Sequence, residues 1–228
     1  MITGASGMMG SAFVKRYRSR YRIVAIHWRH ELACATQNQT FVDPLDPSRP
    51  LRENDDPVFA IRVNLSSEAA IQDACTQIVE SFPRVDLLIN AAAHRRWCSL
   101  LASSGLADAE LVMRVNLLAP IRLAITFATN FWRSHVEENV RLRRNVINVS
   151  STAGAYVFPD RGQSLYGISK AALNHATYHL ANELWDIGIR VNAVAPDTLK
   201  SNTAIDRVLD QMVAFDESNE TGRVVDFD

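Results

Sequence analysis

Apolar runs and amphipathic segments alternate along most of the chain, and this alternation predicts an α/β protein. Continuous apolar runs, typical of strands buried on both faces, lie at residues 21–28, 58–63, 86–92, 145–151 and 189–195. Apolar residues at helical spacing predict helices at 8–20, 69–82, 105–135, from Tyr166 to 187, and 204–215, with a last strand at 221–227. Alternating strands and helices predict a doubly wound, mainly parallel sheet with helices on both faces.

Length and composition fit a single domain that spans residues 1–228. A chain of 228 residues with 47% hydrophobic and 21% charged residues can bury a substantial core. The stretch 31–57 is rich in proline and interrupts the pattern, so it is interpreted as a surface loop.

Charge, apolar runs and cysteines limit the partners that this protein can have. A net charge of −1 creates no field for nucleic acid or an anionic membrane, so we expect neither as a partner. The longest apolar run, residues 117–128, contains Pro120 and Arg122, which argues against a membrane span. The three cysteines stand far apart, with neither disulfide nor zinc spacing. This pattern predicts a reducing, cytoplasmic location and no metal.

A glycine-rich turn opens the chain. Gly4, Gly7 and Gly10 form the pattern G-x-x-G-x-x-G, and Ser6 and Met9 lie inside it. Small residues allow backbone amides to approach a pyrophosphate, and the N-terminus of the following helix favours the anion. The turn therefore predicts a dinucleotide fold of the Rossmann type. Too few residues precede the turn for a full strand, so we expect the first strand to be incomplete.

The ends of two predicted strands supply further candidates for cofactor binding. Arg29 follows the strand at 21–28, where an acidic residue would favour NAD(H) and a basic residue suits a 2′-phosphate. NADP(H) is therefore the preferred cofactor over NAD(H), although Arg29 could also be an ordinary solvated strand end. The strand at 86–92 ends in small residues that leave room for a flat nicotinamide ring: Asn90, Ala91 and Ala92.

Tyr166 and Lys170 form the candidate catalytic pair. A spacing of four places both side chains on one face of a helix. A cation beside a phenol favours the ionised form, which makes tyrosine a usable proton donor near neutral pH. The same spacing is common between surface neighbours, so the pair needs support from other residues.

Such support comes from the order of the motifs. The glycine turn, Asn90 to Ala93, Asn116, Ser151, the Tyr166–Lys170 pair and the run Val191-Asn192-Ala193-Val194-Ala195-Pro196 together resemble the short-chain dehydrogenase/reductase family. The resemblance covers nearly the whole chain and is greatest to the single-domain, ketoreductase-like branch. It implies hydride transfer between NADP(H) and a small carbonyl or alcohol substrate.

The resemblance also implies a role for each site residue. Tyr166 would donate a proton to the carbonyl, Lys170 would hold the nicotinamide ribose, and Ser151 would bind the substrate oxygen. Asn116 would hold a water molecule in a proton relay. The implied cofactor contacts, in chain order, are Gly4, Ser6, Gly7, Met9 and Gly10 at the phosphates, Asn64 and Leu65 at the adenine, Asn90, Ala91 and Ala92 at the adenosine ribose, and Pro196 beside the nicotinamide.

Several departures from that branch keep two alternatives open. Met8 replaces a glycine of the branch's T-G-x-x-x-G-x-G turn, and Asp197 replaces the glycine that usually follows Pro196. The glycine spacing resembles the extended branch, so one alternative is a sugar-nucleotide epimerase or dehydratase. The other alternative is a non-catalytic sensor or scaffold that binds NAD(P).

The substrate side of the predicted site is short. A substrate lid normally follows Pro196, but only residues 197–203 precede the next predicted helix. We therefore expect the numbering to pass over a mobile segment, marked by a Cα–Cα distance far above ~3.8 Å between Asp197 and Ala204.

The sequence also indicates the character of the substrate pocket and of the assembly. The loop 94–97 is basic and aromatic, and it is interpreted as the mouth of the pocket. Four side chains suggest that the pocket is partly aromatic: His94, Trp97, Tyr156 and Phe158. The resemblance implies a homodimer or homotetramer that pairs the helices carrying Asn116 and Tyr166.

Overall fold

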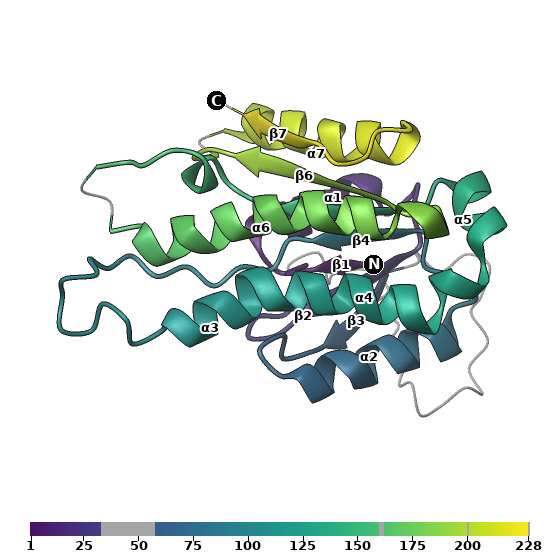
Figure 1. Cartoon of the computed structure of the whole chain (residues 1–228), viewed down its shortest axis with the longest axis horizontal. Coiled ribbons are helices and arrows are strands. Elements are labelled where there is room, and N and C mark those ends of the chain that lie inside the picture. Colours follow the sequence, from purple (N-terminus) through teal and green to yellow (C-terminus); the bar gives the residue numbers. More distant parts are fainter. Residues whose placement is uncertain (33–57, 160–161, 200, 228) are drawn as a thin grey trace.

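The computed structural model describes residues 1–32, 58–159, 162–199 and 201–227. The predicted surface loop at 31–57 therefore lies almost entirely outside the described residues. The elements that position the site appear in Figure 1 and are, in chain order, β1 (Ile2–Thr3), α1 (Met8–Tyr17), β2 (Ile23–His27), β3 (Val58–Arg62), α2 (Glu68–Ser81), β4 (Leu87–Asn90), α3 (Ala109–Met113), α4 (Ala119–Asn130), α5 (Val136–Leu142), β5 (Asn145–Val149), α6 (Ser164–Glu183), β6 (Arg190–Pro196), α7 (Asn202–Glu217) and β7 (Val224–Phe227).

The strands of the described residues form one parallel sheet. Their order is β3-β2-β1-β4-β5-β6-β7, and every neighbouring pair is parallel. This order confirms the predicted doubly wound sheet. The direction of winding reverses between β1 and β4, and in such sheets ligands bind beyond the carboxyl ends of the strands at this reversal.

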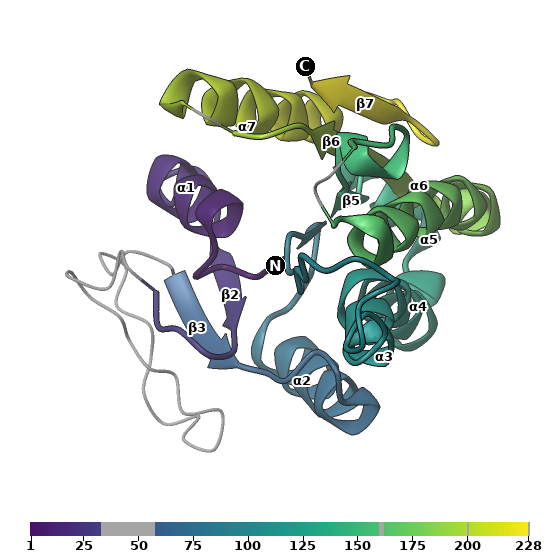
Figure 2. The same cartoon turned by 90° about the vertical axis from the view of Figure 1, so that its left-hand side faces the viewer.

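Helices cover both faces of the sheet, as predicted. Figure 2 shows α1 and α7 on one face and α2, α4 and α6 on the other. In β2, Ile23 and Ala25 pack in the core cluster that includes α1 and α7, whereas Val24 and Ile26 pack in the opposite cluster. Since both faces of each strand are buried, the strands are continuous apolar runs without polar alternation.

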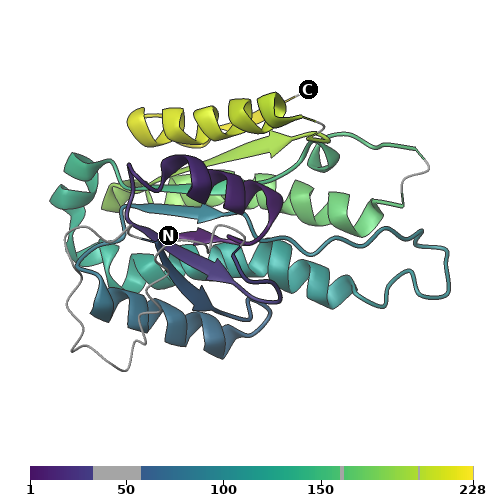
Figure 3. The same cartoon turned by 180° about the vertical axis from the view of Figure 1, so that it is seen from behind.

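The two-residue strand β1 lies in the middle of the sheet (Figure 3). Ile2 pairs with Ala25 of β2 and with Ile89 of β4. Met1 continues the pairing, because its amino group donates to the carbonyl oxygen of Leu87 at 2.7 Å. These few residues form a strand because the strands on both sides supply the hydrogen bonds. The expectation that the first strand is incomplete stays a prediction.

The predicted helix at 105–135 is interrupted. Residues 105–108 form turns, and α3 and α4 are joined by a π-helical turn at Arg114–Leu118. In this turn the N–H group of Ala119 donates to the carbonyl oxygen of Arg114. Pro120 has no N–H group, and its ring crowds the carbonyl group four residues earlier, so the helix widens ahead of the proline.

The same helical segment, Ala109–Ser134, is long and apolar enough to cross a membrane by length and composition. Its mean hydropathy is 1.5 over the most apolar 18-residue window. This stretch packs against α2 and α6, and 44% of the window is buried in the protein. Its apolar character is therefore explained by its place in the helical layer on the sheet.

Two further features lie between the predicted elements. The short helix α5 was not predicted, because seven largely polar residues carry little apolar periodicity. In the numbering, residues 197–201 separate β6 from α7. The expected passage over a mobile segment stays a prediction, because Lys200 lies outside the described residues.

The close approach of the glycine turn to the end of β4 generates a stability prediction. Gly4 has φ +64°, and a Cβ atom there would lie 2.6 Å from the Cα atom of Ala92. Gly222 has φ +70°, but a Cβ atom there would lie 3.6 Å from its nearest neighbour, the Cβ atom of Ala181. Gly222→Ala therefore isolates the cost of the left-handed backbone.

We expect Gly222→Ala to lower the free energy of unfolding by about 1–2 kcal/mol. Gly4→Ala should lower it by roughly 2 kcal/mol more, because the backbone at Ala92 must also move. Urea unfolding of the two variants measures both losses. Equal losses would show that the contact between the turn and β4 is not tight.

Candidate active site

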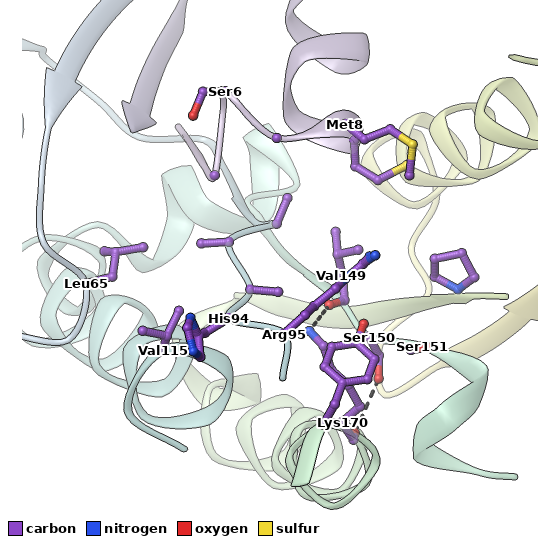
Figure 4. A pocket seen from close by; sticks show the side chains of 18 of the residues that line it. Ser6, Met8, Leu65, His94, Arg95, Val115, Val149, Ser150, Ser151 and Lys170 are labelled. Carbon is purple, nitrogen blue, oxygen red and sulfur yellow. Dashed lines mark hydrogen bonds between the residues drawn. The ribbon is translucent and has the colours of Figure 1, made fainter. Parts of the chain in front are cut away.

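A cavity of about 830 Å³ lies along the carboxyl ends of the strands, where the winding of the sheet reverses. It extends from the glycine turn between β1 and α1 to the first turn of α6. Figure 4 shows Ser6 and Met8 on one side of this cavity and Ser150, Ser151 and Lys170 on the other. The loops that follow β4 and β5 project beyond this same end of the sheet (Figure 1).

The glycine turn forms a tight cradle without bulk on its inner side. The N–H group of Gly7 donates to the carbonyl oxygen of Gly4 at 2.8 Å. A Cβ atom at Gly10 would overlap that same carbonyl group, so the third glycine allows α1 to start directly behind the turn. Helix α1 thus begins at the cavity with its free N–H groups, which is the arrangement that binds a diphosphate.

Thr3 fixes the position of the turn relative to β4. Its Oγ1 atom accepts hydrogen bonds from the N–H groups of Ala91 at 3.1 Å and of Ala92 at 3.2 Å. The sequence alone does not identify this residue. Its only signal is a hydroxyl side chain directly before the first glycine, which is too common to identify on its own.

Most of the predicted site residues meet at the cavity, and three do not. The residues that line it are Gly4, Ser6, Gly7, Met9, Arg29, Asn64, Leu65, Ala91, Ala92, Ser151, Tyr166, Lys170 and Pro196. Gly10, Asn90 and Asn116 lie behind its wall. Asn90 is buried and donates from Nδ2 to Oδ1 of Asn148 at 2.9 Å, so its amide joins β4 to β5 instead of facing the cavity.

The end of the cavity near β2 and β3 combines a cation with a pre-formed turn. Arg29 is exposed and follows β2. Asn64 follows β3, and its Oδ1 atom accepts hydrogen bonds from the N–H group of Ser66 at 3.1 Å and from Oγ of Ser66 at 2.8 Å. The carbonyl half of this amide is therefore engaged in the turn, and its NH₂ half is the group left for a ligand.

Lys170 is buried at the other end of the cavity. Its side chain is 2% exposed, and Nζ donates to the carbonyl oxygen of Val149 at 2.7 Å. Burial, with added repulsion from Arg95, lowers the pKa of Lys170 to about 7. Nζ lies 5.7 Å from the centre of the Tyr166 ring, so the pair that shares a helix face also shares a pocket wall.

The two serines after β5 have different surroundings. Ser150 is buried and donates from Oγ to the carbonyl oxygen of Lys170 at 3.3 Å, which holds α6 against the end of β5. Ser151 lines the cavity, and its Oγ accepts a hydrogen bond from the N–H group of Ala153 at 3.2 Å. The hydroxyl proton of Ser151 is therefore available to donate to a ligand oxygen.

Asn116 connects the loop after β4 to α6. Its Oδ1 accepts from the N–H group of His94 at 2.7 Å, while Nδ2 donates to the carbonyl oxygen of His94 and to Oγ of Ser169, both at 3.0 Å. Ser169 in turn donates to the carbonyl oxygen of Tyr166 at 2.7 Å. Both amide protons of Asn116 are thus used by the protein, which leaves a lone pair of Oδ1 as the only contact it can offer to water.

The basic and aromatic loop lies at the mouth of the cavity, as the sequence predicted. His94, Arg95, Trp97 and Phe158 line the cavity, but Tyr156 does not. The ring centres of Trp97 and Tyr166 are 6.0 Å apart. The guanidinium carbon of Arg95 lies 5.6 Å from the centre of the Tyr166 ring, a contact that the sequence analysis did not identify.

The lowered pKa of Lys170 generates a prediction about stability and pH. Between pH about 7 and the ordinary value of 10.5, the unfolded chain binds a proton at Lys170 that the folded chain does not. The contribution of this residue to stability therefore increases as the pH rises across that window. A Lys170→Met variant lacks this dependence.

We expect the unfolding free energy of the unmodified protein, minus that of Lys170→Met, to increase by roughly 1 kcal/mol for each unit of rising pH. Urea unfolding at about pH 7.5 and 9.5 measures the difference. Lys15→Met, which removes an exposed lysine from α1, serves as the control and should show no such gain. If the difference between the unmodified protein and Lys170→Met did not change with pH, the amine of Lys170 would titrate alike in the folded and unfolded chain.

Comparisons with known proteins agree with this geometry. The family model described as short chain dehydrogenase matches residues 1–212. Glucose 1-dehydrogenase 2 of Bacillus subtilis is 25% identical over 206 residues, which are 90% of this chain and 73% of that protein.

Two solved structures have the same fold over the whole chain. The RhlG/NADP active-site complex of Pseudomonas aeruginosa has a TM-score of 0.78 at 21% identity and covers 100% of this chain and 94% of its own. A Brucella ovis oxidoreductase of the short-chain dehydrogenase/reductase family, in complex with a partially ordered NAD, has a TM-score of 0.71 at 26% identity and covers 100% and 97%. From the sequence match and the shared fold, we conclude that the chain belongs to the short-chain dehydrogenase family.

Proposed function

We propose that the protein is an NADP(H)-dependent oxidoreductase that reduces a carbonyl group or oxidises the corresponding alcohol. One observation carries the proposal: a single cavity joins a glycine turn to Ser151, Tyr166 and Lys170. The turn suits a dinucleotide phosphate. For a carbonyl reduction, Tyr166 supplies the acid, Lys170 the cation and Ser151 the hydrogen-bond donor.

The residues present fit a nicotinamide dinucleotide. The turn would hold the phosphates, since a Cβ atom at Gly4 or Gly10 would clash and only glycine leaves the cradle open. Leu65 and the NH₂ group of Asn64 would contact the adenine, Ala91 and Ala92 the adenosine ribose, and Pro196 the nicotinamide. When bound, the cofactor supplies or accepts the hydride.

Three side chains act on the substrate oxygen in this proposal. Tyr166 holds the proton at its phenolic oxygen and delivers it to the carbonyl oxygen, and Ser151 donates a second hydrogen bond to the same atom. Lys170 adds positive charge beside the phenol and binds the nicotinamide ribose. Asn116 positions this set through His94 and Ser169, and a water on its Oδ1 would connect Lys170 to solvent.

Two alternatives make different predictions for turnover. A sensor or scaffold would bind NADPH without consuming it in the presence of any carbonyl compound. An epimerase or dehydratase would show no net oxidation of NADPH.

A homodimer or homotetramer is also proposed, because apolar side chains are exposed along α4, α6 and the turn between α3 and α4: Leu118, Ile125, Ile168 and Tyr178.

The role of Tyr166 is tested by Tyr166→Phe. We expect kcat to fall by about 10²–10⁴-fold, because the general acid is lost. NADPH binding, followed by fluorescence titration, should change by less than about threefold. NADPH oxidation with a panel of ketones and aldehydes measures the activity. Tyr156→Phe, outside the cavity, should retain full activity; equal activity of Tyr166→Phe would refute the assigned mechanism.

The preference for NADP(H) is tested by Arg29→Glu. A carboxylate there would repel the 2′-phosphate and accept hydrogen bonds from a ribose 2′-hydroxyl group. We expect the ratio of kcat/KM for NADPH over NADH to fall by about 10- to 100-fold. An unchanged ratio would remove Arg29 from the cofactor site, while the same measurement on Arg18→Glu controls for net charge.

A further inference from the structure

Arg95 differs from the charged residues near it because it has no acidic partner among the described residues. It lies in the loop after β4, and Figure 4 shows its side chain extending from that loop into the cavity. Its guanidinium carbon lies 5.6 Å from the centre of the Tyr166 ring, and Nζ of Lys170 lies 5.7 Å from the same centre. Two cationic side chains therefore flank the candidate proton donor.

The neighbours of Arg95 in the loop have acidic partners. Arg96 pairs with Asp108 at 3.0 Å and donates to Oγ of Ser104 at 3.1 Å, and Nε2 of His94 lies 3.7 Å from Asp108. Within the described part of the chain, Arg95 has no carboxylate partner. Its guanidinium group instead makes a cation–π contact with the Tyr166 ring.

The same cavity also has an acidic residue in its wall. Asp197 lines the cavity, but its Oδ1 accepts a hydrogen bond from Oγ1 of Thr152 at 3.4 Å. Among the described residues, no carboxylate forms an ion pair with Arg95 or Lys170, so the positive charge of Arg95 is unpaired at the catalytic end, and Lys170 adds to it when protonated. A site with this imbalance attracts an anion, and a guanidinium offers two parallel donors to a carboxylate.

We propose that Arg95 determines substrate specificity by binding an acid group of the substrate, so that the enzyme reduces an oxo acid to a hydroxy acid. The proposal rests on the proposed function of this site. The carbonyl gains a hydride, that is two electrons and one proton, from the reduced cofactor and a second proton from Tyr166. Tyr166 then regains its proton from solvent. The carboxylate is bound but unchanged.

The cofactor diphosphate is the other source of an anion for Arg95. It is the less favoured partner, because the glycine turn and the start of α1 already form a diphosphate cradle, whereas Arg95 contacts Tyr166. The two sources predict different results, since a diphosphate contact affects every substrate equally and an acid contact affects acids alone.

The kinetic test compares short oxo acids with their methyl esters in the unmodified protein, Arg95→Met and Arg95→Lys. In Arg95→Met we expect kcat/KM for the acids to fall by about 10- to 100-fold, with a change below about threefold for the esters. Arg95→Lys should recover part of the loss. Arg141→Met, which removes an exposed arginine from α5, should leave both classes unchanged.

A binding test does not depend on turnover. Malonate and malonamide are titrated calorimetrically into the protein saturated with NADP⁺, and NADPH binding is measured on each variant. We expect malonate to bind, malonamide to bind at least about tenfold more weakly, and Arg95→Met to abolish the difference.

Three outcomes overturn the proposal. Acids and esters could change alike, malonate and malonamide could bind alike to the unmodified protein, or Arg95→Met could weaken NADPH itself, which would assign Arg95 to the diphosphate. If no carbonyl compound is turned over at all, the proposed function fails, but the malonate titration still decides whether Arg95 holds an acid group.

Discussion

The buried amine of Lys170 is the constraint on which the candidate active site depends. An ammonium group without water loses its solvation, and here one carbonyl oxygen, that of Val149, replaces it. This single contact ties the first turns of α6 to the end of β5. Ser150 strengthens the same junction through the backbone of Lys170. Tyr166, one turn earlier on α6, is thereby held at the cavity wall, and the lowered pKa of Lys170 is the direct cost of that burial.

A second set of contacts positions Tyr166 from the other side. Asn116 holds both backbone groups of His94 and reaches Ser169, which holds the carbonyl group of Tyr166. Asn116 lies in the widened π-helical turn ahead of Pro120. The proline therefore contributes to the site indirectly, because the missing N–H group favours the local geometry from which Asn116 reaches the loop after β4.

Local charge differs from overall charge in this protein. The chain has a net charge of −1, which predicts no strong field. Yet Arg29 lies at one end of the cavity, and Arg95 and Lys170 lie at the other. A nicotinamide dinucleotide phosphate and an acidic substrate would both benefit from such an arrangement. The distribution of cations within one cleft matters for binding, and their sum over the surface does not.

The sequence by itself determined the class of fold and the identity of most cavity residues. Apolar runs and helical spacing are local signals, and they located every strand of the described sheet except β1, for which too few residues were expected. The glycine turn, Ser151, Tyr166 and Lys170 could be found because each occupies a fixed place relative to these elements. Tertiary structure decided what depends on contacts between distant segments. The placement of β1 needed β2 and β4, and the positions of Gly10 and Asn90 behind the wall needed the sheet. Arg95 became a candidate only when folding placed it on Tyr166, 71 positions away in the chain, because no local pattern encodes the charge that surrounds a side chain.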